Sequence, residues 1–154
     1  AWVRFDATAA AYQTLWNFTY STTNTHFSIL GAVGGANINF YHRKADGGLK
    51  SMWISSSDIG GTGAGFVTDQ WYHVAMVWDG TAETLAAYVN AVEEKTATGA
   101  TGLKDSVGGG LQLRVGHYNS SWYVNGIIDD FRVYSTALSA EKIAEIYNSG
   151  TGDY

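Results

Sequence analysis

The stretch from Trp71 to Thr81 most constrains what this chain can fold into. It reads Trp-Tyr-His-Val-Ala-Met-Val-Trp-Asp-Gly-Thr, a run of residues that are typically buried. The run is too polar at its edges for a membrane span and too short to indicate a helix. It ends in Asp79-Gly80, and Asp-Gly is the strongest short-range signal for a β-hairpin. We interpret it as the central strand of an antiparallel sandwich.

Strand-like segments recur along the whole chain, separated by turns that carry Gly, Asn or Asp, such as Asp46-Gly47-Gly48. Ten strands without long helices between them predict an all-β fold, an antiparallel β-sandwich. The predicted strands are residues 2–6, 13–20, 26–32, 37–43, 49–55, 71–78, 84–90, 92–98, 111–115 and 126–134.

Length, charge and cysteine content exclude several classes of protein. The 154 residues predict a single domain, 1–154, and the absence of Cys excludes disulfides and thiolate metal sites. The net charge is −5 and the nine basic residues are scattered apart from Arg43-Lys44, so we expect no nucleic-acid partner. No apolar run approaches the ~20 residues of a membrane span. The chain starts at Ala1 inside a strand-like segment, and we expect it to be part of a longer chain.

Linked motifs in the second half of the chain carry a family resemblance. A family pattern of W-x-H-V-A, D-G, Y-V-N-G, L-R-I-G, I-D-D-V-R-I-Y and A-L-S is matched in order between Trp71 and Tyr147. The chain therefore resembles the laminin-G-like domains of the concanavalin A-like lectin and glucanase superfamily. The resemblance implies a jelly-roll sandwich and an extracellular location, or one on a virion or cell surface. Ala91 departs from the pattern, because the family has Gly there.

The resemblance also bears on the two ends of the chain. Domains of that family begin with further strands before the segment matching Ala1-Trp2-Val3, so this chain is expected to lack the usual N-terminal strands. The earliest of those strands pairs with the final strand, here Gly126 to Tyr134. We expect that strand to pair with an upstream part of the same polypeptide that lies before Ala1, or with a strand donated by a neighbouring subunit, because a free apolar edge promotes aggregation.

A short helix is predicted at residues 140–148. Ser139 is a plausible N-cap, Glu141 lies in the first turn where the helix dipole favours an acid, and Gly150 follows as a stop. We expect the helix to lie over one end of the sandwich, as in the family. Its apolar stripe consists of Leu138, Ile143, Ile146 and Tyr147.

Nothing in the chain matches the catalytic pattern of the glucanase branch. That branch places the acidic pattern E-x-D-x-x-E on one strand face, where one carboxyl protonates the leaving oxygen and another attacks or stabilises the anomeric centre. We expect the protein not to be an enzyme. The glutamates here are Glu83, Glu93, Glu94, Glu141 and Glu145, in predicted turns, a hairpin and the helix.

Asp129 and Asp130 form the candidate metal site. In the domains that this chain resembles, an acidic residue at this place helps to bind a structural Ca²⁺, and Ca²⁺ takes six to eight oxygen ligands. The alternative is that Asp130 pairs with Arg132 or Lys142, or accepts backbone N–H bonds, without a metal.

The segment from His117 to Asn125 contains the residue types that bind sugars. Flat aromatic side chains pack under sugar C–H faces, planar polar groups bond hydroxyls, and such sites lie on loops held by a rigid scaffold. The alternative is that Trp122 or Tyr123 folds back as a lid on the core. Tyr41, Arg43 and Trp53 could join if their strands neighbour the loop. The candidate ligand-binding residues are His117, Tyr118, Asn119, Trp122, Tyr123, Arg43 and Trp53.

Two functions follow. The first is a non-catalytic extracellular recognition module for adhesion, which binds glycan or protein through its end loops and carries a structural Ca²⁺. The second is a structural subunit of a virion, tail fibre or extracellular filament. In either case we expect these side chains to be mostly core: Trp71, Val74, Met76, Trp78, Tyr88, Leu113, Val115, Ile128, Phe131 and Val133.

Overall fold

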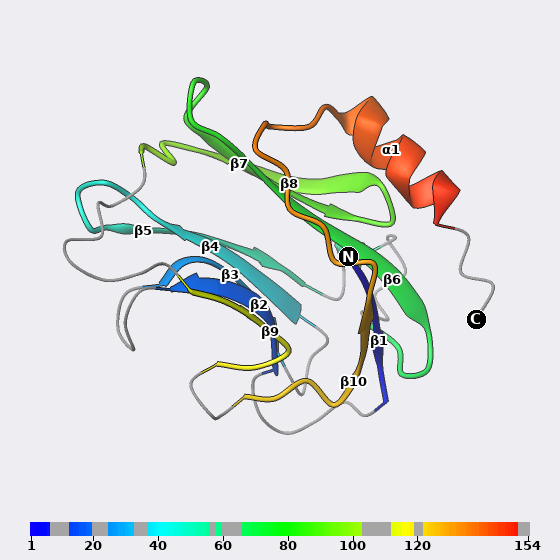
Figure 1. The fold of residues 1–154 in the computed structure, drawn as a ribbon. Coiled ribbons are helices and arrows are strands. Elements are labelled where there is room, and N and C mark those ends of the chain that lie inside the picture. The colour runs from blue at the N-terminus through cyan, green and yellow to red at the C-terminus, as the bar shows by residue number, and fades with distance from the viewer. Residues whose placement is uncertain are drawn as a thin grey trace.

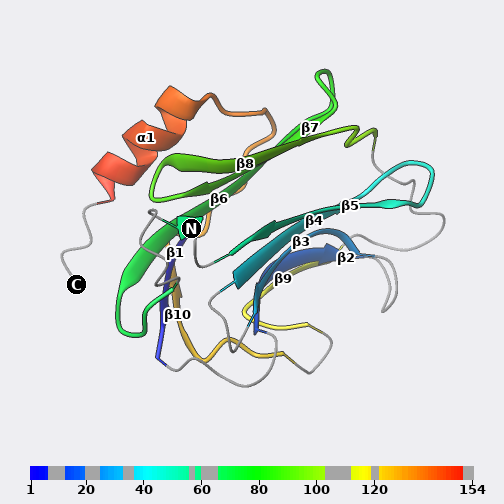
Figure 2. The same cartoon turned by 180° about the vertical axis from the view of Figure 1, so that it is seen from behind.

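Two antiparallel sheets lie face to face, and one helix covers the outer face of one of them (Figure 1; Figure 2 shows the same arrangement from behind). The computed structural model describes residues 1–6, 13–19, 25–32, 37–55, 58–59, 66–102, 112–118 and 122–150. Each sheet has five strands. The predicted all-β sandwich with a short C-terminal helix is confirmed.

The first sheet carries the helix and has the strand order β10-β1-β6-β7-β8. Its strands are β10 (Gly126–Asp129), β1 (Trp2–Phe5), β6 (Trp71–Asp79), β7 (Thr84–Val89) and β8 (Val92–Thr98), and the helix is α1 (Ala140–Ser149).

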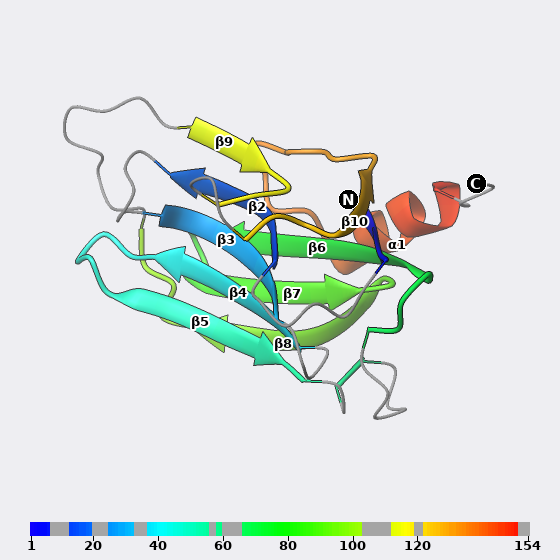
Figure 3. The same ribbon diagram turned by 90° about the horizontal axis from the view of Figure 1, so that it is seen from below.

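The second sheet has the order β5-β4-β3-β2-β9 and is nearest the viewer in Figure 3. Its strands are β5 (Leu49–Ile54), β4 (Asn37–Arg43), β3 (Thr25–Ala32), β2 (Gln13–Thr19) and β9 (Gln112–Val115). Apart from β10, the predicted strands agree with the observed ones to within one residue at each end.

Strand β6 is buried on both faces because its side chains alternate. Tyr72 and Val74 point into the core between the sheets, where Val74 has no exposed surface. Ala75 and Val77 point the other way and pack in the smaller cluster beneath α1. A strand covered on both sides reads as a continuous apolar run, which is what the sequence shows from Trp71 to Trp78.

The helix is fixed at its start and along its apolar face. The backbone N–H of Lys142 donates to the Ser139 hydroxyl oxygen at 3.3 Å, so Ser139 is the N-cap as predicted. Ile143 is 1% exposed and packs with Ala86 and Tyr88 of β7. The ring of Tyr147 stacks on Trp2 of β1 at 5.4 Å between centroids. The predicted helix packs on the sandwich, but it lies on the outer face of the first sheet rather than over one end.

The predicted core is correct in part. Val74 and Tyr88 are buried, and Met76, Trp78, Ile128 and Phe131 are partly buried against the main core, whereas Trp71 is half-buried. Leu113, Val115 and Val133 are 44%, 38% and 58% exposed, so the prediction is wrong for them. Leu113 and Val115 lie on β9 at the edge of the second sheet, and Val133 lies beyond the end of β10. Few neighbours can cover a side chain at a sheet edge.

Strand β10 is shorter than predicted, and it ends at Asp129 rather than at Tyr134. Its pairing with β1 runs from Phe5↔Gly126 to Trp2↔Asp129, and Asp130 then takes a left-handed backbone with φ of 47°. Gly126–Asp129 is paired as expected, but its partner is β1 of this chain, so the prediction of a partner before Ala1 or in a neighbouring subunit is wrong for this edge. Residues 131–134 form no β-ladder with any described strand.

Truncation of Ile143 tests how much the contact between α1 and the first sheet contributes to stability. We expect Ile143→Ala to lower the free energy of unfolding by about 2–5 kcal/mol, because it removes buried methyl groups and leaves a cavity. Ile127→Ala is the matched control, since Ile127 is 42% exposed, and it should cost less than about 1 kcal/mol. Urea denaturation measures both values. Equal losses in the two variants would contradict the position of α1.

His73 should make the protein lose stability in acid. The side chain is 3% exposed beside Trp2 and Tyr147. Burial penalises the charged imidazolium and lowers the pKa of His73 to about 4, although Asp130 acts in the opposite direction. The unfolded state therefore binds a proton before the folded state does, so stability is full above the unfolded pKa of 6.5 and is lost as the pH falls toward 4. We expect a loss on the order of a few kcal/mol over this range. His73→Phe, which keeps a ring, should flatten the slope of unfolding free energy against pH, and an unchanged slope would refute this.

Candidate ligand-binding loop

The connection between β9 and β10 presents four aromatic side chains in two stacked pairs. We define the aromatic loop as His117, Tyr118, Trp122 and Tyr123. The ring of His117 stacks on Tyr123 with centroids 5.8 Å apart, and Tyr118 stacks on Trp122 at 5.1 Å, each pair at 21° between planes. Gly116, with φ of 81°, lets the chain turn away from β9 just before the loop.

Strand β2 anchors the aromatic loop through hydrogen bonds. The amide Nδ2 of Asn17 donates to the carbonyl of His117 at 2.9 Å, and the backbone N–H of Thr14 donates to the carbonyl of Trp122 at 2.9 Å. The N–H of Asn125 donates to Gln13 Oε1 at 2.6 Å. Asn17 has no exposed surface. The loop is therefore tied at both ends to β2, the strand next to the edge strand β9.

Trp122 has a strained backbone. Its φ is 52°, in the left-handed region that bulky L-residues rarely adopt. The stack on Tyr118 and the bond from Thr14 hold the residue in this conformation. Strain of this kind costs on the order of 1–3 kcal/mol and clusters at ligand-binding sites.

Two of the four aromatic side chains of the loop are exposed. Trp122 is 38% exposed and Tyr123 is 60% exposed, while Val124, the next residue, packs against the main core. The alternative in which Trp122 or Tyr123 forms a lid on the core is therefore wrong. The exposed ring surface is available to a ligand.

Arg43 and Trp53 do not join the aromatic loop. They lie on β4 and β5, whereas the loop follows β9 at the opposite edge of the same sheet. Four strand spacings separate the two edges, about 19 Å. Arg43 Nη1 donates to the carbonyl of Gly47 at 3.0 Å and so closes the β4–β5 turn, while Trp53 is 45% exposed. Asn119 and the side chain of Tyr41 lie outside the described residues.

Asp129 and Asp130 do not by themselves form a calcium site. Asp130 Oδ1 accepts from Arg132 Nε at 2.6 Å, and Asp129 Oδ1 accepts from the backbone N–H of Asp130 at 2.7 Å. The pairing of Asp130 with Arg132 is the alternative that the sequence left open. Within the described ranges, no three His, Cys, Asp or Glu side chains gather where they could hold a metal. Two carboxylates engaged in this way fall short of the six to eight oxygens that Ca²⁺ takes, so its binding stays a prediction.

The sequence did not point to Asn17 or Gln13 as supports of the loop. Asn17 lies 100 residues before His117, and Gln13 lies 112 residues before Asn125. No short motif links positions so far apart. The one local hint is that Asn17 stands inside a strand-forming segment, where a buried amide needs hydrogen-bond partners.

Comparisons with known proteins give a family and a set of similar folds. The family model described as the concanavalin A-like lectin/glucanases superfamily matches residues 1–144. No curated protein sequence matches this chain. In the described part of the chain, no helix is long and apolar enough to cross a membrane.

Three solved structures illustrate the likeness. A native heptameric SAP-like pentraxin from Limulus polyphemus has a TM-score of 0.67 at 16% identity, covering 95% of this chain and 66% of that one. The receptor binding domain of botulinum neurotoxin D has a TM-score of 0.64 at 17% identity, and the match covers 96% of this chain and 35% of that one. The CBM40 of the Ruminococcus gnavus IT-sialidase has a TM-score of 0.72 at 15% identity, and the match covers 95% of this chain and 79% of that one. This chain thus spans about two thirds of the pentraxin and about a third of the neurotoxin domain, and the likeness is one of fold.

The Asn17 anchor can be tested by an isosteric change. Asn17→Asp replaces the donating amide with a carboxylate oxygen that faces the His117 carbonyl in a buried position, so we expect a loss of about 3 kcal/mol or more in unfolding free energy. Asn125→Asp is the control, because Asn125 is exposed and bonds through its backbone. Denaturant titration at neutral pH measures both variants. Similar stabilities of the two would contradict the anchoring role.

Proposed function

Because the chain belongs to the concanavalin A-like lectin/glucanases superfamily, we propose that it is a non-catalytic recognition module that binds glycan through its aromatic loop. The observation that carries the proposal is the pair of ring stacks, each with one exposed member, Trp122 or Tyr123, on a loop anchored to β2. The proposal includes an extracellular or cell-surface setting and a role in adhesion.

The chemistry of the aromatic loop suits a sugar. Tyr123, at 60% exposure, offers a ring face to the C–H face of a pyranose, and the phenol groups of Tyr118 and Tyr123 can donate to or accept from hydroxyls. His117 Nδ1 lies 3.3 Å from the carbonyl of Val115. If Nδ1 donates there, Nε2 carries the lone pair and can accept from a sugar hydroxyl.

The similar structures support a binding role. Two of them are a receptor binding domain and a carbohydrate-binding CBM40 domain. Each matches at least 95% of this chain. A sandwich of this kind hosts many functions, so the support for glycan in particular comes from the loop.

The carboxyl groups support a non-catalytic role. A glycosidase needs one carboxyl whose pKa is raised so that it can act as a general acid. Four described carboxyl groups have a pKa that departs clearly from the usual value, and in all four the pKa is lowered. Hydrogen bonds lower the pKa of Asp58, chiefly from Ser55, and that of Glu93, chiefly from Thr96. The same direction holds for Asp46, beside Lys44, and for Glu141.

A glycan array with matched variants tests the proposal. We expect Tyr123→Ala to weaken binding to the recognised glycan about tenfold or more, because it removes the most exposed ring of the loop. Trp122→Gly should act similarly, and Gly tolerates the positive φ so that the backbone is not further strained.

Trp53→Ala is the control. Trp53 is also an exposed aromatic residue, at 45%, on the same sheet but at its far edge. It should leave binding unchanged. Binding that is lost in Trp53→Ala and kept in Tyr123→Ala would place the site elsewhere, and an array without any selective signal would refute glycan recognition.

A further inference from the structure

The pair Asn125-Gly126 joins the aromatic loop to β10. Asn125 lies in the bend just before the strand and is exposed. Its hydrogen bonds to described residues run through its backbone, from the N–H to Gln13 Oε1 at 2.6 Å and to the carbonyl from the N–H of Asp6 at 3.0 Å. The side-chain amide is therefore free to turn toward the next peptide nitrogen. Asn is a chemically labile residue, and a following Gly hinders attack on its side chain least, because Gly has no Cβ.

Packing against β1 requires Gly at position 126. A Cβ there would lie 2.0 Å from the carbonyl oxygen of Arg4, far inside van der Waals contact. The close approach of the two strands therefore places Gly directly after Asn125.

The backbone nitrogen of Gly126 is not held by the ladder between β1 and β10. Mutually bonded pairs recur at every second residue of an antiparallel ladder. The N–H of Asp6 donates to the carbonyl of Asn125, so the next pair, Phe5↔Gly126, is not hydrogen-bonded. The carbonyl of Phe5 accepts instead from the N–H of Asp69 at 2.8 Å, on the other side of β1.

We propose that Asn125 is a site of spontaneous conversion to isoaspartate, through a cyclic succinimide formed with Gly126. Base removes the proton of the Gly126 N–H, and the nitrogen attacks Cγ of Asn125. The new N–Cγ bond closes a five-membered ring. The side-chain nitrogen takes up a proton and leaves as ammonia when its bond to Cγ breaks.

Water then opens the succinimide at one of its two carbonyl carbons. Breaking the N–Cγ bond gives Asp, whereas breaking the bond from nitrogen to the original main-chain carbonyl carbon gives isoaspartate. In isoaspartate the main chain runs through Cγ and is longer by one methylene group. In both cases an amide and one water become a carboxylate and an ammonium ion, and nothing is oxidised or reduced.

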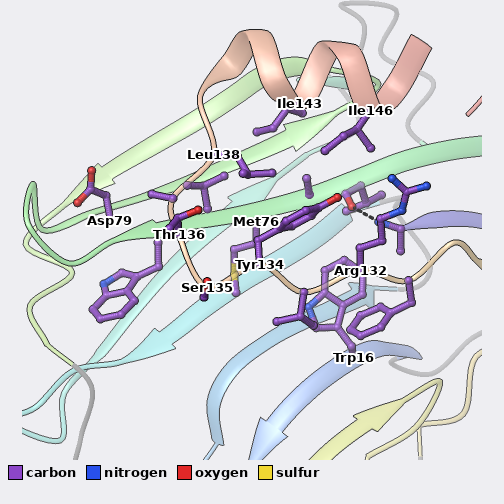
Figure 4. Close-up of a pocket in the computed structure, with 18 of the residues that line it drawn as sticks. Trp16, Met76, Asp79, Arg132, Tyr134, Ser135, Thr136, Leu138, Ile143 and Ile146 are labelled. Carbon is purple, nitrogen blue, oxygen red and sulfur yellow. Dashed lines mark hydrogen bonds between the residues drawn. The ribbon is translucent and has the colours of Figure 1, made fainter. Parts of the chain in front are cut away.

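Comparable side chains elsewhere in the fold are held by hydrogen bonds. Asp79-Gly80 lies where β6 meets the hairpin turn (Figure 4), and Asp79 Oδ1 accepts from two backbone N–H groups of that turn at 2.8 and 3.0 Å. Asn90 Oδ1 accepts from the backbone N–H of His73 at 2.9 Å. These contacts oppose the rotation that the reaction needs, and Asn125 lacks an equivalent contact with any described residue.

The conversion changes one end of the aromatic loop, and its effect on binding rests on the proposed function. In isoaspartate the carbonyl that accepts from Asp6 becomes a carboxylate, and the extra methylene shifts the chain between the bond to Gln13 and β10. Both bonds help to fix the loop. We therefore expect isoaspartate at position 125 to weaken glycan binding about tenfold, because less preorganised rings lose more entropy on binding.

Peptide mass spectrometry of the folded chain, incubated in mildly alkaline buffer, tests the modification. Trypsin releases residues 115–132, and fragment spectra locate the change from NH₂ to OH within that peptide. We expect it at Asn125, faster at higher pH, with the isoaspartyl product accepting a methyl group from an isoaspartyl methyltransferase. The rate should stay within about tenfold of that in the urea-unfolded chain. Asn90 should remain intact over the same time, and Asn125→Gln should give no product at this position.

Glycan binding by the aged protein tests the consequence. Ion exchange separates the converted forms, which carry one more negative charge than the fresh protein. Asn125→Asp has the same charge without the additional methylene, so it should bind glycan more tightly than the isoaspartyl form. Asn125→Gln should bind equally well before and after incubation.

The two parts of the proposal fail separately. A folded rate about a hundredfold or more below the unfolded rate, or conversion of Asn90 as fast as that of Asn125, would overturn the modification site. Equal glycan binding by the isoaspartyl form and fresh protein would overturn the effect on the loop. Absence of glycan binding by fresh protein would refute the proposed function and this effect with it, whereas the mass spectra decide the modification on their own.

Discussion

Burial of β6 on both faces is the constraint on which the rest of the structure depends. Its inward side chains, such as Val74, meet the second sheet, and its outward ones, such as Ala75, need a cover that α1 supplies. One edge pairs with β7 along six residues, and the other pairs with β1. The sandwich and the helix cover are therefore two consequences of one strand that is apolar on both sides.

The aromatic loop depends on the second sheet in a similar way. Its two ring stacks would be costly to order in a free loop, because each immobilised side chain loses rotamer entropy. Bonds from Asn17 and Thr14 to the loop carbonyls fix the backbone first, and this preorganisation lowers the cost of binding a ligand. The left-handed Trp122 is held by these contacts, so recognition and strand packing are coupled through β2.

Local patterns in the sequence predicted most of the fold. The Asp79-Gly80 hairpin and the Ser139 cap are short-range signals, and both are present in the structure. Two errors share a different cause. The exposure of Val115 and the separation of Arg43 from the aromatic loop both depend on strand order, which a single sequence does not carry. The aromatic residues of the loop could be predicted from their clustering in a short segment. The hydrogen bond that anchors them to Asn17 joins residues 100 positions apart, and no local pattern predicts it.

The central claim is that ligand is recognised on the aromatic loop of a rigid sandwich. Two-dimensional NMR of the chain with its recognised glycan tests this most directly, because each backbone amide reports its own surroundings. The account predicts that shifts concentrate on His117, Tyr118, Trp122 and Tyr123, with smaller changes at Asn17 of β2. Shifts that instead concentrate on Trp53 at the far edge of the second sheet would contradict it.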